Sequence, residues 1–256
     1  MSGTVVITGA NGSLALGFVE SFLKLYPQHT LVATVRNPSP EKDPNTAKLA
    51  KLVSRHARAK VHIEALDLSK LASVRAFAEK LASQVYAKEL PRISAIICNA
   101  ATLSLEAGQN FTSDGYEATF QVCHLSHYLL ILKLLDSMDA QSGRIVMLGS
   151  ITHYPEKVNP LSSLRPCFPD NFEELVKPSR DPPSLVHDRG FQRYGTAKLA
   201  NVTLMDDLNK RLKQVRKTPL YIASWSKYLT CIRIPNYRTS PSRPWTRADF
   251  PLQGLN

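Results

Sequence analysis

Residues 5–17 read VVITGANGSLALG, a short β-branched run that leads directly into a glycine-rich turn. The β-branched residues favour a strand, and after the turn apolar residues recur at helical spacing at Phe18, Phe22 and Leu23. A glycine-rich turn between a strand and a helix lets backbone N–H groups and the positive end of the helix dipole face an anion. The segment therefore predicts a phosphate-binding turn, although a tight structural turn would give a similar pattern.

Short apolar runs and helical patterns continue to alternate along the chain. Further strands are predicted at 31–35, 61–66, 93–98 and 145–148, with a sixth candidate at 220–223, and helices at 43–57, 70–86, 114–138 and 190–214. This alternation indicates a parallel sheet with helices on both faces. We therefore predict one α/β domain over residues 1–223, with a doubly wound parallel sheet of the Rossmann type.

Two segments interrupt the alternation. Residues 152–189 contain seven prolines and predict a long irregular insertion. Long ordered loops are usually functional, so we expect this insertion near the active site. Residues 224–256 contain prolines, arginines and both tryptophans without periodicity, and we interpret them as an atypical basic tail.

Composition favours a folded, intracellular protein. Hydrophobic residues make up 43% of the chain and charged residues 21%, which suits one buried core and not a disordered chain. None of the four cysteines forms a CxxC pair, so free thiols in a reducing compartment are expected. The N-terminus resembles a strand more than a signal peptide, and no apolar run approaches the ~18 residues of a membrane span. We expect a cytoplasmic protein without a membrane span.

The net charge of +11 raises the question of an anionic partner. A basic surface can bind nucleic acid or an anionic membrane. The basic residues are spread along the chain, however, with no Lys/Arg block longer than a pair. A solvated basic surface explains this distribution better, so no nucleic-acid partner is expected.

Two positions after predicted strands suggest how a nucleotide would be held. Arg36 ends the second strand, 19 residues after Gly17. An acidic residue there would bind the ribose hydroxyls of NAD, whereas an arginine can pair with the 2′-phosphate of NADP; a solvent-exposed arginine is the alternative. Asp67 and Leu68 follow the third strand and could meet the adenine, although Asp67 could equally cap the helix that begins near Ser69.

The second half of the chain supplies candidate acid–base groups. Tyr194 and Lys198 are four residues apart in a helical pattern and share one helix face. A nearby ammonium lowers the pKa of a phenol and makes it a better acid–base group, although an unrelated surface pair would show the same spacing. Ser150 follows the fifth strand, where a hydroxyl could bond a substrate oxygen or merely cap a turn.

Taken together, these motifs resemble the short-chain dehydrogenase/reductase family, across about residues 1–223. The ordered set is Thr8, Gly9, Gly12, Asp67, Asn99, Ala100, Ser150, Tyr194 and Lys198. Within the family the chain is most similar to NADP-preferring members of the retinol-dehydrogenase-like and fungal keto-reductase types, which also carry a long segment between the serine and the tyrosine.

The resemblance implies a role for each residue. Tyr194 would be the general acid/base, Lys198 would lower its pKa and hold the nicotinamide ribose, and Ser150 would orient the carbonyl. The cofactor-binding set would comprise Gly9, Asn11, Gly12, Ser13, Leu14, Arg36, Asp67, Leu68, Asn99, Ala100, Tyr194 and Lys198. The implied activity is an NADP(H)-dependent interconversion of a small-molecule ketone and a secondary alcohol. Secondary metabolism is suggested only by the fungal resemblance, and a homo-oligomer is compatible with it.

Some positions depart from the family pattern. Ser13 and Ala15 replace two glycines of the usual turn, while Gly12 and Gly17 lie nearby. Cys123 occupies the position of an asparagine that anchors a relay water in many members, and a thiol is a weaker hydrogen-bonding group. His124 and His127 have a spacing that could suit a metal, but no third ligand is apparent, and helical packing explains them better.

The C-terminus departs further. No Pro-Gly turn follows residue 223, and only 33 residues remain from Ser224 onward. We expect a poorly ordered tail that leaves the lid and one sheet edge missing. The alternative to the oxidoreductase is therefore a truncated, catalytically weak relative that binds cofactor or a partner without efficient turnover.

Overall fold

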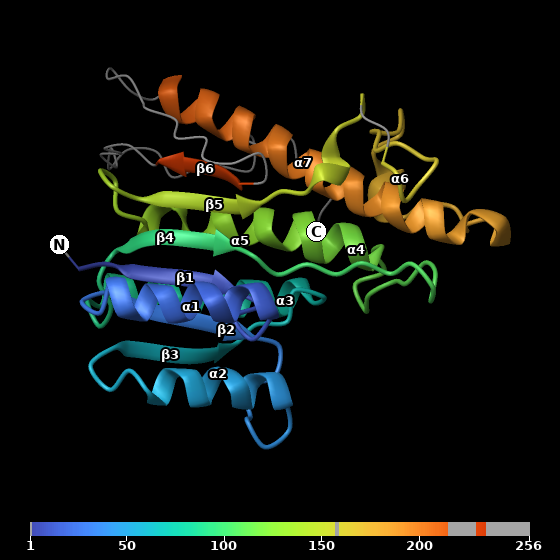
Figure 1. Cartoon of the computed structure of the whole chain (residues 1–256). Coiled ribbons are helices and arrows are strands. Elements are labelled where there is room, and N and C mark those ends of the chain that lie inside the picture. Colours follow the sequence, from blue (N-terminus) through green and yellow to red (C-terminus); the bar gives the residue numbers. More distant parts are fainter. Residues whose placement is uncertain (1, 157–158, 215–228, 234–256) are drawn as a thin grey trace.

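The predicted strands form a parallel sheet in the computed structural model, which describes residues 2–156, 159–214 and 229–233. The parallel strands are β1 (Thr4–Thr8), β2 (Thr30–Val35), β3 (Lys60–Ala65), β4 (Ile93–Cys98) and β5 (Arg144–Leu148). The principal helices are α1 (Ser13–Leu25), α2 (Pro44–Ser54), α3 (Leu71–Tyr86), α5 (Ser126–Leu134) and α7 (Val186–Gln214). The predicted α/β class is confirmed (Figure 1).

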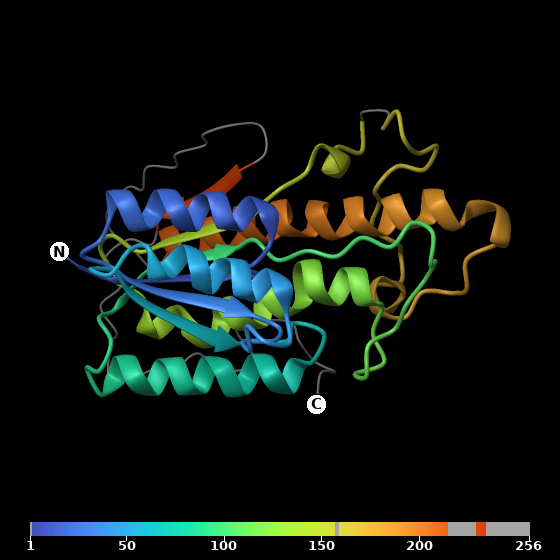
Figure 2. The same ribbon diagram turned by 60° about the horizontal axis from the view of Figure 1, so that its bottom comes forward.

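Alternate residues of each strand enter different cores. In β1, Val6 packs in the core shared with α3, α5 and α7, whereas Val5 and Ile7 pack in the core under α1 and α2. Strands buried on both faces explain the near-continuous apolar runs in the sequence. Figure 2 shows the resulting layers, with α1 and α3 on opposite sides of the sheet.

The strand order is β3-β2-β1-β4-β5-β6, so the direction of winding reverses between β1 and β4. Ligands of open α/β sheets bind beyond the carboxyl ends of the strands at such a reversal. Thr8 ends β1 and Cys98 ends β4, which brings the glycine-rich turn beside Asn99 and Ala100.

The helix predicted at 114–138 begins later and is not uniform. It starts with α4 (Ala118–Phe120), passes through a π-helical turn η1 (Gln121–Leu125) into α5, and ends in the 3₁₀ turn η2 (Leu135–Ser137). By length and composition, the stretch Ala118–Ser137 could cross a membrane, which corrects the expectation that no run approaches that length. This is weak evidence, because more than half of the stretch is buried as a core helix would be.

The free edge of β5 is covered, contrary to the expected missing edge. Strand β6 (Leu229–Arg233) pairs antiparallel with β5, from Arg144 opposite Arg233 to Leu148 opposite Leu229. Its sequence, LTCIR, contains the β-branched residues that favour a strand. The strand predicted at 220–223 lies outside the described residues, as does the rest of the tail.

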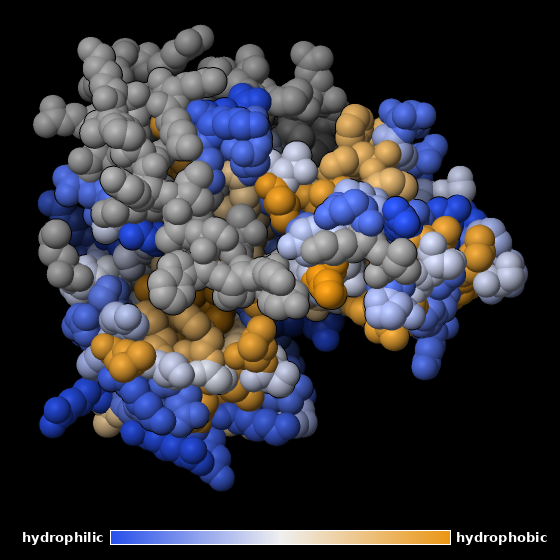
Figure 3. Space-filling model, turned by 45° about the horizontal axis from the view of Figure 1, so that its top comes forward, coloured by the Kyte–Doolittle hydropathy of each residue, from blue (hydrophilic) through white to orange (hydrophobic). Residues whose placement is uncertain are grey.

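The insertion packs against the N-terminal part of α7. Before α7 begins at Val186, its described residues form the short helices η3 (Ile151–His153, which begins just before it), α6 (Glu173–Val176) and η4 (Pro183–Leu185). Leu161, Phe168 and Phe172 are exposed within it, and Figure 3 shows apolar patches among hydrophilic residues on this part of the surface. The insertion therefore presents a mixed surface beside α7.

Candidate active site

A cavity of about 720 Å³ lies at the winding reversal and collects the predicted cofactor residues. Its lining includes all of them: Gly9, Asn11, Gly12, Ser13, Leu14, Arg36, Asp67, Leu68, Asn99, Ala100, Tyr194 and Lys198. Ser150 is adjacent to the lining residue Gly149 and hydrogen-bonds Tyr194. The sequence motifs thus converge on one cavity of the size typical for small-molecule sites.

The glycine-rich turn leaves the start of α1 open. Gly9 has φ +63°, and a Cβ there would lie 3.0 Å from that of Ala100, so both backbone conformation and space require glycine. Gly12 is the N-cap of α1 and provides no side chain to its first N–H groups, and no acidic residue occupies the first turn. These features suit an anion. At Gly17, by contrast, a Cβ would meet no atom within 4 Å, so packing does not require a glycine there.

Thr8 and Asn99 hold the turn against β4. The Asn99 side chain donates to the carbonyls of Thr8 at 2.9 Å and Gly9 at 3.2 Å. The Thr8 hydroxyl accepts the N–H groups of Asn99 and Ala100, each at 3.0 Å, and lies 2.9 Å from His127 Nε2. The sequence predicted Asn99 and Ala100 beside the cofactor but contained no sign that His127 would reach Thr8.

Asn11 lines the cavity and also hydrogen-bonds other side chains of the protein. Its side-chain amide donates to Thr46 Oγ1 at 3.1 Å and to Asp43 Oδ2 at 3.3 Å. Asp43 is the N-cap of α2 and accepts the N–H groups of Asn45 and Thr46. Asn11 therefore ties the glycine-rich turn to the start of α2, a connection that the sequence did not predict.

Arg36 and Asp67 both line this cavity. Arg36 is exposed and its charge helps to lower the pKa of Asp67. Burial alone would raise the pKa of Asp67, but hydrogen bonds from the Ser69 N–H and hydroxyl, at 3.0 and 2.6 Å, together with the charges of Lys70 and Arg36, leave it lowered. Asp67 thus stabilises the turn before α3 and does not cap the helix, because α3 begins at Leu71 with Lys70 as its N-cap. The cofactor interpretation of Asp67 stays a prediction.

Tyr194 and Lys198 face the cavity together, but their electrostatics differ from the prediction. Burial raises the pKa of Tyr194, and only its hydrogen bond with Ser150 lowers it. Lys198 Nζ lies 5.5 Å from the ring centroid of Tyr194 and donates instead to the Leu148 carbonyl at 2.7 Å. Burial also lowers the pKa of Lys198. In this arrangement burial leaves the phenol pKa raised in place of the expected lowering by Lys198, whose ammonium donates to the Leu148 carbonyl.

Cys123 lies buried in the π-helical turn, and its thiol both accepts and donates a hydrogen bond. Its thiol accepts the N–H of Thr102 at 3.4 Å and donates to the carbonyl of the same residue at 3.3 Å. The Cys123 carbonyl accepts the side-chain amide of Asn201 at 3.0 Å, and Asn201 also contacts His124 Nδ1 at 2.8 Å. A thiol can thus make both bonds to the loop after β4, and Asn201 joins the π-helical turn to α7.

The two histidines have protein partners in place of a metal. His124 contacts Asn201 and His127 contacts Thr8. Burial lowers their pKa values, to about 4 for His124 and about 3 for His127, so both rings are neutral at physiological pH. Across the described ranges, no three His, Cys, Asp or Glu side chains come together as a metal site would require.

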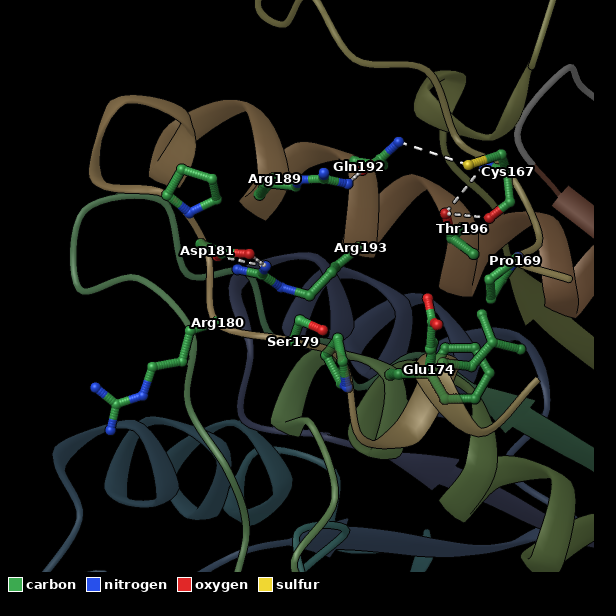
Figure 4. A pocket seen from close by; sticks show the side chains of 14 residues that line it. Cys167, Pro169, Glu174, Ser179, Arg180, Asp181, Arg189, Gln192, Arg193 and Thr196 are labelled. Atoms are coloured by element: carbon green, nitrogen blue, oxygen red, sulfur yellow. Dashed lines mark hydrogen bonds and ion pairs between the residues drawn. The ribbon is translucent and has the colours of Figure 1, made fainter. Parts of the chain in front are cut away.

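A second cavity of about 270 Å³ opens where the insertion meets α7 (Figure 4). Arg193 lies at its centre, ion-paired with Asp181 at 2.5 Å and with Glu117 at 3.4 Å. Burial raises the pKa of Glu117, which the charge of Arg193 partly offsets. Because Arg193 ion-pairs with both carboxylates, we interpret the three side chains as a connection between the insertion, the start of α4 and α7.

The fold and the principal cavity define a Rossmann-type α/β protein, and comparison with known proteins gives its family. The model for short chain dehydrogenases matches residues 3–159, more than half of the chain. The chain belongs to the short-chain dehydrogenase/reductase family.

Curated relatives are longer than this chain. It is 34% identical over 245 residues to short-chain dehydrogenase iccH of Talaromyces variabilis, a match that covers 83% of this chain and 65% of that protein. It is 32% identical over 213 residues to the human WW domain-containing oxidoreductase, covering 81% of this chain and 45% of the relative. The chain therefore spans less than two thirds of the length of these relatives.

Solved structures share the fold at low sequence identity. NADPH-bound carbonyl reductase from chicken fatty liver has a TM-score of 0.56 and 20% identity, covering 82% of this chain and 71% of that one. A short-chain oxidoreductase from Burkholderia phymatum, in complex with NAD, has a TM-score of 0.55 and 19% identity, covering 84% and 62%. These similarities support the fold and do not choose between the two cofactors.

Proposed function

We propose that this protein is an NADP(H)-dependent oxidoreductase that interconverts a ketone and a secondary alcohol, with Tyr194 as general acid/base. The observation that carries the proposal is that Tyr194 and Lys198 line the same cavity as the open glycine-rich turn and Arg36. A single dinucleotide could then reach from Arg36 to the phenol. When bound, the nicotinamide supplies or accepts the hydride.

The residues of the cavity fit such a cofactor. The open start of α1 suits the pyrophosphate, and the exposed guanidinium of Arg36 suits a 2′-phosphate. Ser150 and Tyr194 would both bond the carbonyl oxygen, and Tyr194 would hold the proton that this oxygen receives. Lys198 would turn from the Leu148 carbonyl toward the ribose, a movement that would also bring its charge to bear on the phenol.

The test is NADPH consumption over a panel of ketones by the wild type and by Tyr194→Phe. Removal of the phenol hydroxyl should lower turnover by about 10²–10⁴-fold, the range for a general acid, with little change in NADPH affinity. If both proteins oxidise NADPH equally slowly with every ketone, the assignment of Tyr194 is wrong.

A second candidate is a relative that binds NADPH without efficient turnover. The observation that favours it is the raised pKa of Tyr194, which leaves the phenol a weaker acid in this arrangement. Stoichiometric NADPH binding with uniformly slow ketone reduction would identify this case. Secondary metabolism, a cytoplasmic location and a homo-oligomer stay predictions.

A further inference from the structure

The second cavity, where the insertion meets α7, shares no lining residue with the principal cavity. Its volume is about 270 Å³. Helix α7 contributes to both cavities, with Arg193 and Thr196 in the second and Tyr194 and Lys198 in the principal one. The proposed reaction therefore leaves the second cavity without a role.

Five apolar residues form part of the walls of the second cavity. They are Phe120, Leu175 and three prolines of the insertion, Pro169, Pro178 and Pro182. Phe120 belongs to a buried cluster, and Leu175 packs against that cluster, so the core holds these two side chains in place. The proline rings fix the backbone angle φ and keep the facing wall stiff. Walls of this kind favour the apolar part of an organic ligand.

Several polar groups of the second cavity already have protein partners. Arg193 ion-pairs with Asp181 and Glu117. Thr196 Oγ1 accepts the N–H of Cys167 and donates to the carbonyl of the same residue, both at 3.2 Å. These groups hold the insertion to α7, and their hydrogen-bonding capacity is used within the protein.

Arg189 differs from these groups because most of its donors have no protein partner. Its Nη1 donates to Gln192 Oε1 at 2.6 Å, and Gln192 in turn donates to the Arg165 carbonyl at 2.8 Å. A guanidinium has five N–H donors. Within the part of the chain that the structure describes, the bond to Gln192 is the one side-chain hydrogen bond of Arg189, and no carboxylate pairs with it. Because the residue is half-buried, an anion beside it would replace lost hydration.

The other two charged side chains of the lining leave Arg189 as the anchoring group. Figure 4 shows Arg180 directed away from the other lining residues, and Glu174 across the cavity from Arg189. Glu174 is exposed, so water solvates its charge. A ligand with its anionic end at Arg189 therefore keeps that end away from the Glu174 carboxylate.

We propose that the second cavity binds a small organic carboxylate, with the carboxylate at Arg189 and the apolar body against Phe120, Leu175 and the three prolines. A planar guanidinium can give a carboxylate two parallel hydrogen bonds. The bond from Nη1 to Gln192 orients the guanidinium and leaves Nη2 and Nε for the ligand. The apolar walls favour an organic acid over inorganic phosphate. This site takes no part in hydride transfer, so it stands apart from the proposed function.

The test measures binding and needs no turnover. Phenylacetate is the probe, phenylacetamide is its uncharged counterpart, and ligand-observed NMR titration gives their dissociation constants. Phenylacetate should bind with a dissociation constant of about 1–10 mM, the range for a ligand of this size. Phenylacetamide should bind at least about fivefold more weakly, because it lacks the charge that Arg189 would bond. Inorganic phosphate at equal concentration should not displace phenylacetate.

Three variants locate the bound probe. Arg189→Met removes the guanidinium and should weaken phenylacetate about tenfold while changing phenylacetamide by less than about twofold. Ser179→Trp puts a large side chain at an exposed lining position and should weaken both ligands at least about tenfold by a steric clash. Arg75→Met is the matched control, because Arg75 is also half-buried but lines neither cavity, and it should stay within about twofold of the wild type.

Equal affinity of phenylacetate for the wild type and Arg189→Met would overturn the proposal, as would binding that Ser179→Trp leaves unchanged or an absence of binding to the wild type. Equal affinity for phenylacetamide would overturn the carboxylate, and displacement by phosphate would overturn the organic acid. If Arg189→Met does not fold, as thermal unfolding would show, Ser179→Trp decides alone. Absence of ketone turnover is the separate failure of the proposed function and leaves these binding results in force.

Discussion

The polar groups at the two ends of the principal cavity differ in whether other protein groups hydrogen-bond them. At the glycine-rich turn, the first N–H groups of α1 have no capping side chain and Arg36 is exposed. At the end that holds Tyr194, Lys198 bonds the Leu148 carbonyl and Asn201 bonds the Cys123 carbonyl. An open end is suited to bind an anion, whereas a paired end is suited to hold side chains in place. Substitutions at the open end should therefore change cofactor binding. Substitutions around the paired end should change stability or proton transfer.

The largest effect is expected at the buried triad of Arg193, Glu117 and Asp181, which connects α7 to the insertion. Arg193 is only 12% exposed, and its partners Glu117 and Asp181 are 2% and 7% exposed. Arg193→Met would leave two buried carboxylates without a cation and should lower the free energy of unfolding by about 3–5 kcal/mol.

Denaturant unfolding measures this loss. Lys24→Met is the matched control, because the pair of Lys24 with Glu20 is exposed on both sides and should contribute less than about 1 kcal/mol. Equal effects of the two substitutions would show that the triad does not connect the insertion to α7.

At the open end, two glycines should behave in opposite ways. Gly9→Ala forces an alanine into φ +63° and against Ala100, and should cost about 2 kcal/mol of stability and weaken NADPH binding. Gly17→Ala lies in helix α1 with free space and should add up to about 1 kcal/mol of stability without changing NADPH affinity. Thermal unfolding and NADPH titration separate them, and a similar loss of affinity in both would contradict the assignment of the turn to Gly9.

Two buried histidines should make stability depend on pH. Their pKa values fall from 6.5 to about 4 for His124 and about 3 for His127. Their contribution to folding stability is therefore fully present above pH 6.5 and is lost as the pH falls toward those values. In this range the histidines bind protons in the unfolded chain but not in the folded chain.

Each histidine should contribute a slope of about 1.4 kcal/mol per pH unit within this window. Unfolding free energies measured across it should show a shallower dependence in His124→Gln and in His127→Gln. His187→Gln should keep the wild-type slope, because His187 is 57% exposed. Slopes that do not differ among the four proteins would mean that the buried rings are charged.

The smallest effect is expected at Arg36. Arg36→Asp should weaken NADPH by about five- to tenfold and NADH less, because an exposed charge pair contributes only about 1 kcal/mol. Titration with both nucleotides measures the difference. Equal changes in the two affinities would contradict a 2′-phosphate at Arg36.

The open end could be predicted because its signals are local. The β-branched run, the turn and Arg36 lie within 32 residues of sequence, and each follows the end of a strand or opens a helix. The residues that pair at the catalytic end carry no such signature. Thr8 and His127 are 119 positions apart, and His124 and Asn201 are 77 apart, so only the folded chain reveals them.

Electrostatics at the phenol also depended on the fold. The spacing of Tyr194 and Lys198 placed them on one helix face correctly, but the direction of the Tyr194 pKa shift followed from burial, which only the folded chain reveals. Similarly, the loss of periodicity after residue 224 suggested a bare sheet edge, whereas residues 229–233 form a strand on it.

The most direct measurement is a crystal structure of the protein with bound NADPH. We predict the pyrophosphate at the start of α1, the 2′-phosphate at Arg36, and the nicotinamide between Tyr194 and Lys198. A dinucleotide bound elsewhere, or one whose nicotinamide lies away from the Tyr194 phenol, would contradict the account.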